Sequence, residues 1–472
     1  MIWVSLKNAL FLEMGKNKKI LQPKYLFIAV CISVFTLSSC TPEDGIEEPT
    51  VIDQELVDLL NSTSETGSLN YFKIPQSDDF EDIPADPKNP LTATKVELGK
   101  MFFHETELGS LPKLQEGLGT YSCASCHHAA AGFQAGVKQG IGEGGSGFGS
   151  MGESRTANPN YEDNDLDIQP IRTPTALNTA FQDVMLWNGQ FGATGTNAGT
   201  EAQWTANTPI AVNELGFQGL ETQAIAGFNV HRQGVNDEFF TSYPTYKAML
   251  DEAYPDLPEN ERYSNIGIGL AIAAFERTLL SNEAPFQKYL NGNRAELTIP
   301  QKRGALVFFG KGNCVSCHTG PALNNMEFFA LGMKDLDARN TDLSIPGALG
   351  ASKGRGGFTK NASDDFKFKT PQLYNLQDHN FFGHGGTFES IEDIIRYKNA
   401  AAVEKTAIAG HQNLADEFVP LNLNDSEISD LVDFLSNALY DRNLTRFVPG
   451  SVLSGGCIPN NDAQTKADLG CD

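Results

Sequence analysis

Two five-residue motifs in the chain combine a pair of cysteines with a histidine at the same spacing. They contain Cys123, Cys126 and His127 in Cys-Ala-Ser-Cys-His, and Cys314, Cys317 and His318 in Cys-Val-Ser-Cys-His. The C-x-x-C-H pattern is the attachment sequence of c-type haem, in which two thiols bond to the haem vinyl groups and the histidine ligates the iron. A four-thiolate zinc site or a thioredoxin-like redox pair would leave the histidine after each pair unexplained. The spacing therefore predicts two covalently bound haem c groups.

The N-terminus has the features of an export signal. Lysines precede an apolar run from Tyr25 to Leu37, which is too short to cross a bilayer as a helix. The run ends in Leu37-Ser-Ser-Cys40, which resembles the bacterial lipobox, where the cysteine becomes the lipidated first residue. We expect residues 1–39 to be removed and Cys40 to carry a lipid anchor; an ordinary cleaved signal and a short anchor helix are the alternatives. The expected location is the cell envelope, facing the periplasm or the cell surface, which agrees with the assembly of haem c outside the bacterial cytoplasm.

Two further cysteines, Cys457 and Cys471, lie in a C-terminal tail rich in Gly, Asn and Asp. Eight cysteines in 472 residues are too sparse for a disulfide scaffold. In an oxidising compartment, however, a disulfide between Cys457 and Cys471 would hold an end that otherwise frays. We predict that bond.

The chain is acidic, with 35 Lys and Arg against 59 Asp and Glu and a formal net charge of −24. Loss of residues 1–39 removes five lysines and one glutamate, so the mature chain is more acidic still. Such a surface repels phosphates and argues against nucleic-acid binding. It favours a basic redox partner, and we expect a small donor protein of the cytochrome c or cupredoxin type.

Apolar periodicity predicts a mostly α fold of two cytochrome c-like haem domains with long loops and little β structure. Ser426 is the expected N-cap of the last helix, and residues 132–152 are expected to form a Gly-rich loop. The helices are expected at Leu91–Phe103, Tyr263–Leu280, Pro300–Phe309, Ser390–Lys398 and Asp425–Leu439. The expected division of the chain is a signal peptide at 1–39, an acidic tether and N-terminal segment at 40–90, a first haem domain at 91–260, a second at 261–450 and a tail at 451–472.

Several motifs around the two haem sites occur in an order that resembles the bacterial di-haem cytochrome c peroxidase/MauG family. The resemblance covers roughly Leu91 to Val448, most of the mature chain. The motifs are Glu97–Phe103, Ser122–His127, Arg172–Thr175 with Asn178, Trp187–Gly189, Asn213–Gly216, Phe275–Thr278, Asn313–Pro321, Thr370-Pro371, His384–Gly386 and Ser390–Glu392.

The resemblance implies a role for each haem. The first would bind hydrogen peroxide and the second would pass electrons to it. Glu214 matches the family's distal acid, which would move a proton between the peroxide oxygens, although a lone Glu is usually a surface carboxylate. Trp187 matches an aromatic between the haems that would relay electrons, although most Trp residues simply belong to a core. Gln203 aligns with a distal-pocket Gln.

Departures from the family pattern concern the ligands. No His lies between His128 and His231 to close the first haem, which we therefore expect to be open, or closed by another residue such as Met151. An open first haem would bind peroxide without prior reduction. On the second haem the family uses Met or Tyr; here we favour Tyr397 as the ligand, with Lys398 or a different residue left open. Arg172 replaces an Asn that holds calcium in family members, which puts calcium in doubt.

Three functions remain open from the sequence. The first is an oxidoreductase of the cytochrome-c peroxidase type that reduces H2O2 to water with electrons from an external donor, as a monomer or a homodimer. The second is a MauG-like oxidase that uses high-valent iron to modify a partner protein. The third is an electron-transfer cytochrome without a substrate, which would need neither Glu214 nor an open haem.

Overall fold

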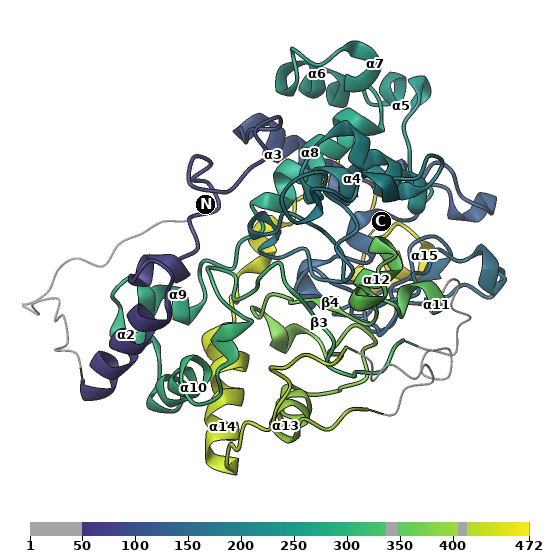
Figure 1. Cartoon of the computed structure of the whole chain (residues 1–472). Helices are drawn as coiled ribbons and strands as arrows, with labels where there is room; N and C mark the ends of the chain where they lie inside the picture. Colours follow the sequence, from purple (N-terminus) through teal and green to yellow (C-terminus); the bar gives the residue numbers. More distant parts are fainter. Residues whose placement is uncertain (1–49, 337–347, 405–412, 472) are drawn as a thin grey trace, which may run out of the picture. The chain divides into compact units, whose positions relative to one another are not determined.

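The computed structural model describes residues 50–336, 348–404 and 413–471, and these residues are mostly helical (Figure 1). The predicted signal peptide and Cys40 lie outside them. The α-helices are α2 (Val51–Thr63), α3 (Ala93–His104), α4 (Gly219–Val230), α5 (Asp237–Ser242), α6 (Pro244–Ala253), α7 (Glu259–Arg262), α8 (Asn265–Arg277), α9 (Pro285–Leu290), α10 (Ile299–Phe309), α11 (Ala348–Ala351), α12 (Arg355–Thr359), α13 (Ile391–Ala400), α14 (Asp425–Asp433) and α15 (Ala463–Leu469).

The β structure of the described residues consists of two-stranded antiparallel pairs and isolated bridges. The paired strands are β1 (Gly145–Ser146) with β2 (Thr156–Ala157), and β3 (Phe328–Phe329) with β4 (Phe368–Lys369). The prediction of a mostly α fold with little β is therefore confirmed. None of the helices in the described ranges combines the length and apolarity needed to cross a bilayer.

The five predicted helices are all present, with small shifts at their ends. The largest difference is at α14, which is capped by Asn424 in a capping box with Glu427, and not by Ser426. The Asn424 side chain accepts from the Glu427 N–H, and the Glu427 carboxylate accepts from the Asn424 N–H, so two otherwise unpaired helix donors are satisfied. A π-helical turn, Phe434–Ala438, continues this helix toward Leu439.

One helix precedes each haem-attachment motif. A second helix, later in the chain, packs against that preceding helix. α3 precedes the first motif and packs against α8, while α10 precedes the second and packs against α14 (Figure 1). Both contacts need a glycine: a Cβ at Gly99 would lie 1.8 Å from the Ala271 carbonyl oxygen, and one at Gly304 would lie 2.0 Å from that of Asp430. The two halves therefore repeat one packing arrangement.

Two apolar cores correspond to these halves. One joins α3, α4, α6 and α8 around residues such as Phe103 and Phe275, and the other joins α2, α9, α10, α13 and α14 around residues such as Phe286 and Phe434. The helix α8 lies beyond the expected boundary at residue 260, yet it packs with the first half. A buried ion pair between Arg277 and Glu221, at 2.7 Å, binds α8 to α4.

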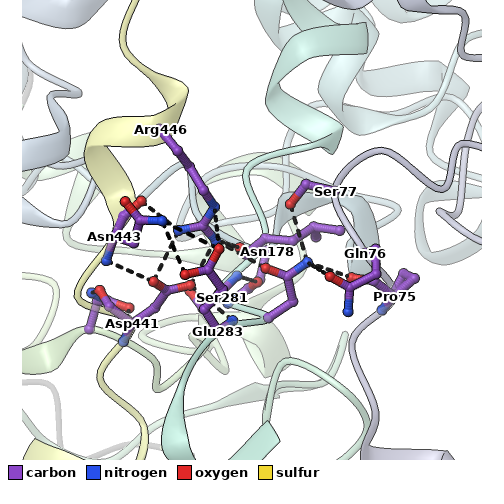
Figure 2. Close-up of polar contacts among 12 residues, drawn as sticks. Pro75, Gln76, Ser77, Asn178, Ser281, Glu283, Asp441, Asn443 and Arg446 are labelled. Carbon is purple, nitrogen blue, oxygen red and sulfur yellow. Dashed lines mark hydrogen bonds and ion pairs between the residues drawn. The ribbon is translucent and has the colours of Figure 1, made fainter. Parts of the chain in front are cut away.

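A polar cluster, which we call the polar junction, joins segments from across the chain (Figure 2). Arg446 donates to the Asp441 carboxylate at 2.7 Å, to the Leu280 carbonyl at 2.8 Å and to Asn282 at 3.0 Å. Asn282 in turn donates to the Pro75 carbonyl at 3.0 Å. The junction thereby fastens the N-terminal segment and the C-terminal part of the chain to the turn that follows α8.

Asn178 connects the polar junction to the segment between the two haem motifs (Figure 2). Its side-chain oxygen accepts from the Ser281 N–H at 3.0 Å, and its backbone N–H donates to the Leu279 carbonyl at 2.7 Å. Asn178 has a φ of +57°, a left-handed conformation that Asn adopts more readily than most residues. Asn178 is therefore anchored to the turn that follows α8.

The N-terminal segment is folded from Thr50 onward, whereas residues 40–49, where the expected tether begins, lie outside the described residues. Leu56 and Leu60 of α2 are fully buried against the second core, and Asp53 forms a buried ion pair with Lys302 of α10 at 2.7 Å. The helix α2 is amphipathic: Leu56 and Leu60 face the core, and its acidic residues other than Asp53, which are Glu55 and Asp58, are exposed.

We expect Leu60→Ala to lower the free energy of unfolding by about 2–5 kcal/mol, because it leaves a cavity in the second core. The matched control on the same helix is Val51→Ala, since Val51 is 88% exposed, and its effect should stay within about 0.5 kcal/mol. Chemical denaturation of the holoprotein measures both. If both variants lowered the free energy of unfolding by the same small amount, α2 would not pack against the second core.

Candidate functional site

The first C-x-x-C-H motif forms a tight turn on η4 (Cys123–Ser125). The N–H of Ser122 donates to the Ser125 hydroxyl at 3.0 Å, and the N–H of His127 donates to the Cys123 carbonyl at 3.1 Å. These bonds close the turn between the two thiols and the imidazole.

The second motif repeats this turn on η12 (Cys314–Ser316). The N–H of His318 donates to the Cys314 carbonyl at 2.9 Å. Asn313, which precedes the turn, has a φ of +47°, again a conformation that suits Asn. None of the four motif cysteines is in a disulfide, so all four thiols are available for attachment.

Both motif histidines are held by a backbone carbonyl at Nδ1. His127 Nδ1 lies 3.2 Å from the Phe133 oxygen, and His318 Nδ1 lies 3.1 Å from the oxygens of Leu323 and Pro371. A carbonyl can only accept, so Nδ1 carries the proton and Nε2 keeps its lone pair for a metal. Burial lowers the pKa of each imidazole to about 4, aided at His318 by the charge of Lys398. Both are neutral at pH 7, which is the form that ligates iron.

A cavity of about 500 Å³ opens beside the second motif and includes Cys314, Cys317 and His318 in its wall. The rest of the wall is largely apolar, with side chains from α13 and from the chain around β3 and β4. A cavity of this size and character is typical of a cofactor site, for which roughly 300–1,000 Å³ is common.

The wall of this cavity carries buried donors that lack partners. Arg172 is 4% exposed, yet its Nε and Nη2 have no hydrogen-bond partner among the described residues, and the same holds for Nδ1 of the buried His379. Burial lowers the pKa of Arg172 to about 9, and burial followed by the charge of Arg172 lowers the pKa of His379. A buried guanidinium without a counter-ion is costly, so this edge suits an anion. The carboxylate of a haem propionate would supply the anion that Arg172 requires. The size and the apolar character of the whole wall fit haem c.

The segment from Arg172 to Thr175 touches both motifs. Thr175 donates to the Gly132 carbonyl at 2.6 Å in the turn after the first motif, and the Pro174 carbonyl accepts from His127. Arg172 lines the second cavity, and its carbonyl accepts from Trp187 Nε1 at 2.9 Å. Trp187 also lines this cavity, with its ring edge-on to His384. One short stretch of chain thus connects the first histidine with the aromatic at the second site.

The other residues expected at the first haem lie on short turns near the surface. Glu214 is exposed on η10 (Pro209–Leu215) and makes no hydrogen bond or ion pair with another described residue. Gln203 is half-buried at the end of η9 (Glu201–Gln203). Met151 is 41% exposed in a surface turn whose N–H groups bind Glu153, so nothing directs its sulfur toward His127. The roles of Glu214 and Gln203 stay predictions.

Tyr397 is not among the residues that line the second cavity, and its role as a ligand of the second iron stays a prediction. Its hydroxyl donates to the Leu331 carbonyl, and its ring packs between Phe388 and Phe418. The neighbouring Lys398 lines the cavity instead. Consecutive residues on a helix point about 100° apart, so only one of the two can face the site.

Two residues near the first motif were missed from the sequence. His231 is paired with Asp167 at 2.9 Å, and its charge acts on His127, which places this pair close to the first histidine. Burial opposes protonation of His231, but Asp167 outweighs it and raises the pKa above its usual value. Glu276 on α8 is buried beside Cys123, and burial raises its pKa to about 8. Glu276 lies within the Phe275–Thr278 motif, but the contacts of both residues depend on partners that are far away along the chain.

The C-terminal tail packs against the first motif. Cys457 and Cys471 form a disulfide, as the sequence predicts. The Pro459 carbonyl accepts from the Ser122 hydroxyl at 3.0 Å, directly before the motif. Asp468 accepts from the N–H groups of Phe148 and Gly149, so the tail also holds the Gly-rich loop. Within the described ranges no three Asp, Glu, His or Cys side chains gather as a metal site.

Comparisons with known proteins agree with these sites. Residues 93–295 match the family model described as di-haem cytochrome c peroxidase. The chain is 27% identical over 358 residues to the methylamine utilization protein MauG of Methylorubrum extorquens, covering 75% of this chain and 81% of that protein. It is 26% identical over 396 residues to the cytochrome-c peroxidase IdrP1 of Denitromonas iodatirespirans, covering 79% of this chain and 89% of that protein.

The crystal structure of a MauG-like protein associated with microbial copper homeostasis shares the fold, with a TM-score of 0.52 and 22% identity over 79% of this chain and 95% of that chain. The arrangement of two C-x-x-C-H turns in a mostly α chain defines a di-haem c-type protein. The chain is similar to the di-haem cytochrome c peroxidases and to MauG, and this similarity implies two haem c groups.

We expect Arg172→Gln to make the reduction potential of the second haem more negative, because it removes a buried positive charge that stabilises the added electron, by roughly 1–4 kcal/mol. Spectroelectrochemical titration of the holoprotein measures the shift. Arg303→Gln is the control, since Arg303 is half-exposed on α10 and paired with Asp430. An unchanged potential in the Arg172 variant would contradict an anion site at this edge.

Proposed function

We propose that the protein is a di-haem c-type peroxidase that reduces hydrogen peroxide to water with electrons from an external donor protein. The observation that carries this proposal is the pair of matched histidines, each held at Nδ1 by a carbonyl and connected through one segment and one Trp. When bound, the two haems would supply the iron that takes up peroxide and the iron that stores and delivers electrons. The chain's own residues would divide the remaining work between the two sites.

Glu214 is the residue we propose for proton transfer at the first site. Cleavage of the O–O bond requires a proton to move from the oxygen that stays to the oxygen that leaves, and a positioned carboxylate can carry it. Support comes from the family motif and from the fact that the carboxylate is not engaged by any described residue, so it is available to accept a proton. Gln203 would assist by orienting peroxide through its amide.

Trp187 is proposed as the electron relay. Its indole N–H is bonded to the Arg172 carbonyl, two residues before Pro174, whose own carbonyl accepts from His127. This contact chain supports a short path from the second cavity to the first histidine. Further parts of the proposal are a donor of the cytochrome c or cupredoxin type and an envelope location with a lipid on Cys40. They rest on the acidic charge and on the N-terminal motif.

The similarity to MauG supports a second candidate, an oxidase that keeps two oxidising equivalents for a partner protein. The two functions differ in the need for a donor. A peroxidase turns over only while reduced donor is supplied, whereas a MauG-like enzyme forms a long-lived oxidised state without one.

We expect Glu214→Gln to lower kcat for peroxide reduction by about 10²–10⁴-fold, because the amide keeps the shape of the carboxylate but cannot accept the proton. Steady-state oxidation of a reduced cytochrome c by peroxide measures this. Optical spectra of both haems should match those of the unaltered protein, since no described residue depends on this side chain.

The matched control is Glu238→Gln, an exposed carboxylate on α5 that should leave kcat unchanged. Full activity of the Glu214 variant would remove this residue from the mechanism. Absence of peroxide turnover in the unaltered holoprotein, with every donor class supplied, would contradict the proposed function as a whole.

A further inference from the structure

The cavity beside His318 contains several side chains that could ligate a metal, and most are already engaged. His384 Nε2 lies 3.0 Å from the Asp335 carboxylate, and its ring stacks on Phe368 at 3.7 Å. Lys369 is buried and donates to Gln182 and to the Val184 carbonyl. His379 lies in the field of Arg172, at the edge assigned above to an anion. Met185 also lines the cavity but packs in the first apolar core, and Glu417 lines it but is exposed. Lys398 and Met333 are the remaining candidates that we compare.

The geometry of α13 turns Lys398 into the cavity. The helix begins after Ser390, whose side chain caps the Asp393 N–H at 3.0 Å. Ile391, Ile394, Ile395 and Lys398 all line the cavity, and they occupy positions i, i+3, i+4 and i+7, which is one face of a helix. A lysine therefore occupies the last position of an otherwise apolar stripe.

Lys398 has no hydrogen bond or ion pair from its side chain to another described residue. Two residues earlier on the same helix, Arg396 is exposed and paired with both Glu392 and Asp425. Lys398 is half-buried, and an ammonium without a partner along a largely apolar wall is less favourable than a neutral amine bound to a metal. The charge of Lys398 also acts on His318, Cys314 and Cys317, so its side chain lies within electrostatic range of the whole attachment motif.

We propose that Lys398 is a ligand of the second haem iron, bound through Nζ in addition to His318. This proposal rests on the function proposed above, because it requires haem c at the second motif. On binding, the ammonium releases one proton to solvent and the amine lone pair forms the bond to iron, with no change of oxidation state. The second haem would then be six-coordinate through two nitrogen ligands.

A nitrogen ligand changes what the second haem does. Methionine raises the potential of c-type haems, so replacing its sulfur with an amine makes the iron harder to reduce. The ligand also closes the second iron to peroxide. Peroxide chemistry would then be confined to the first site, and the second would serve as the electron store.

Met333 is the competing ligand, since its side chain also lines the cavity. Its sulfur lies against Gly383, 3.4 Å from where a Cβ would stand on that residue. A thioether bound to ferric haem gives a near-infrared charge-transfer band that an amine does not, so the two ligands can be distinguished directly.

The test uses the ferric holoprotein with both haems attached, as verified by intact mass. Electron paramagnetic resonance and near-infrared magnetic circular dichroism are recorded for the unaltered protein, Lys398→Met, Lys398→Ala and Met333→Leu. We expect a low-spin second haem without a thioether band. Lys398→Met should create that band and shift the potential of the second haem upward, and Lys398→Ala should lose the low-spin amine signal. Met333→Leu should change none of these readings.

The control on the same helix is Arg396→Ala, which should leave every spectrum unchanged. A thioether band in the unaltered protein that disappears in Met333→Leu would overturn the proposal. A second-haem spectrum unaffected by Lys398→Ala would do the same. Failure of the proposed function is a separate result, seen as a missing second haem in the intact mass or as absent peroxide turnover in the unaltered protein.

Discussion

The arrangement of the two sites depends on the short segment from Arg172 to Asn178. At one end, Pro174 and Thr175 are bonded to the turn that holds His127. At the other, Asn178 is fixed to the turn after α8 and so to the polar junction. Arg172 meets the second cavity and positions Trp187 through its carbonyl. This segment therefore connects the two haem-attachment motifs within the fold.

The charge of the cavity wall differs from the charge of the chain as a whole. The chain carries a formal charge of −24, yet the wall of the second cavity contains Arg172, Lys369 and Lys398. Burial lowers the pKa of Lys369 to about 7, so this wall holds less positive charge than its residues suggest. The cations in the cavity wall suit a cofactor with anionic edges. The net negative charge of the chain suits a donor protein with a basic face.

Features that depend on residues close together in the sequence could be predicted from it. Features that depend on tertiary contacts between distant residues could not. The two C-x-x-C-H motifs and the disulfide depend on residue type and spacing, and the helices before each motif follow from their apolar periodicity. The docking of α2 was missed because its leucines find their partners on α10, far along the chain. The Asp167–His231 pair spans 64 residues and has no local signature.

The neighbours Tyr397 and Lys398 are a third case, in which helical phase carries information in addition to residue type. Ile391, Ile394 and Ile395 form an apolar stripe, and Lys398 is the next residue on the same face. The structure places this face, and not Tyr397, along the cavity wall. Glu214 is the opposite case, because its proposed role comes chiefly from the motif, and the structure adds only that no described residue engages its carboxylate.

The central claim, that the first haem site is open and takes up peroxide without prior reduction, is tested most directly by mixing the fully oxidised holoprotein with one equivalent of hydrogen peroxide. The absorption spectrum is followed in a stopped-flow instrument without any reductant, and a reduced donor protein is added afterwards. The account predicts an immediate change in the spectrum of the first haem, which the donor then reverses. A resting protein with two low-spin haems that responds to peroxide only after reduction by one electron would contradict it.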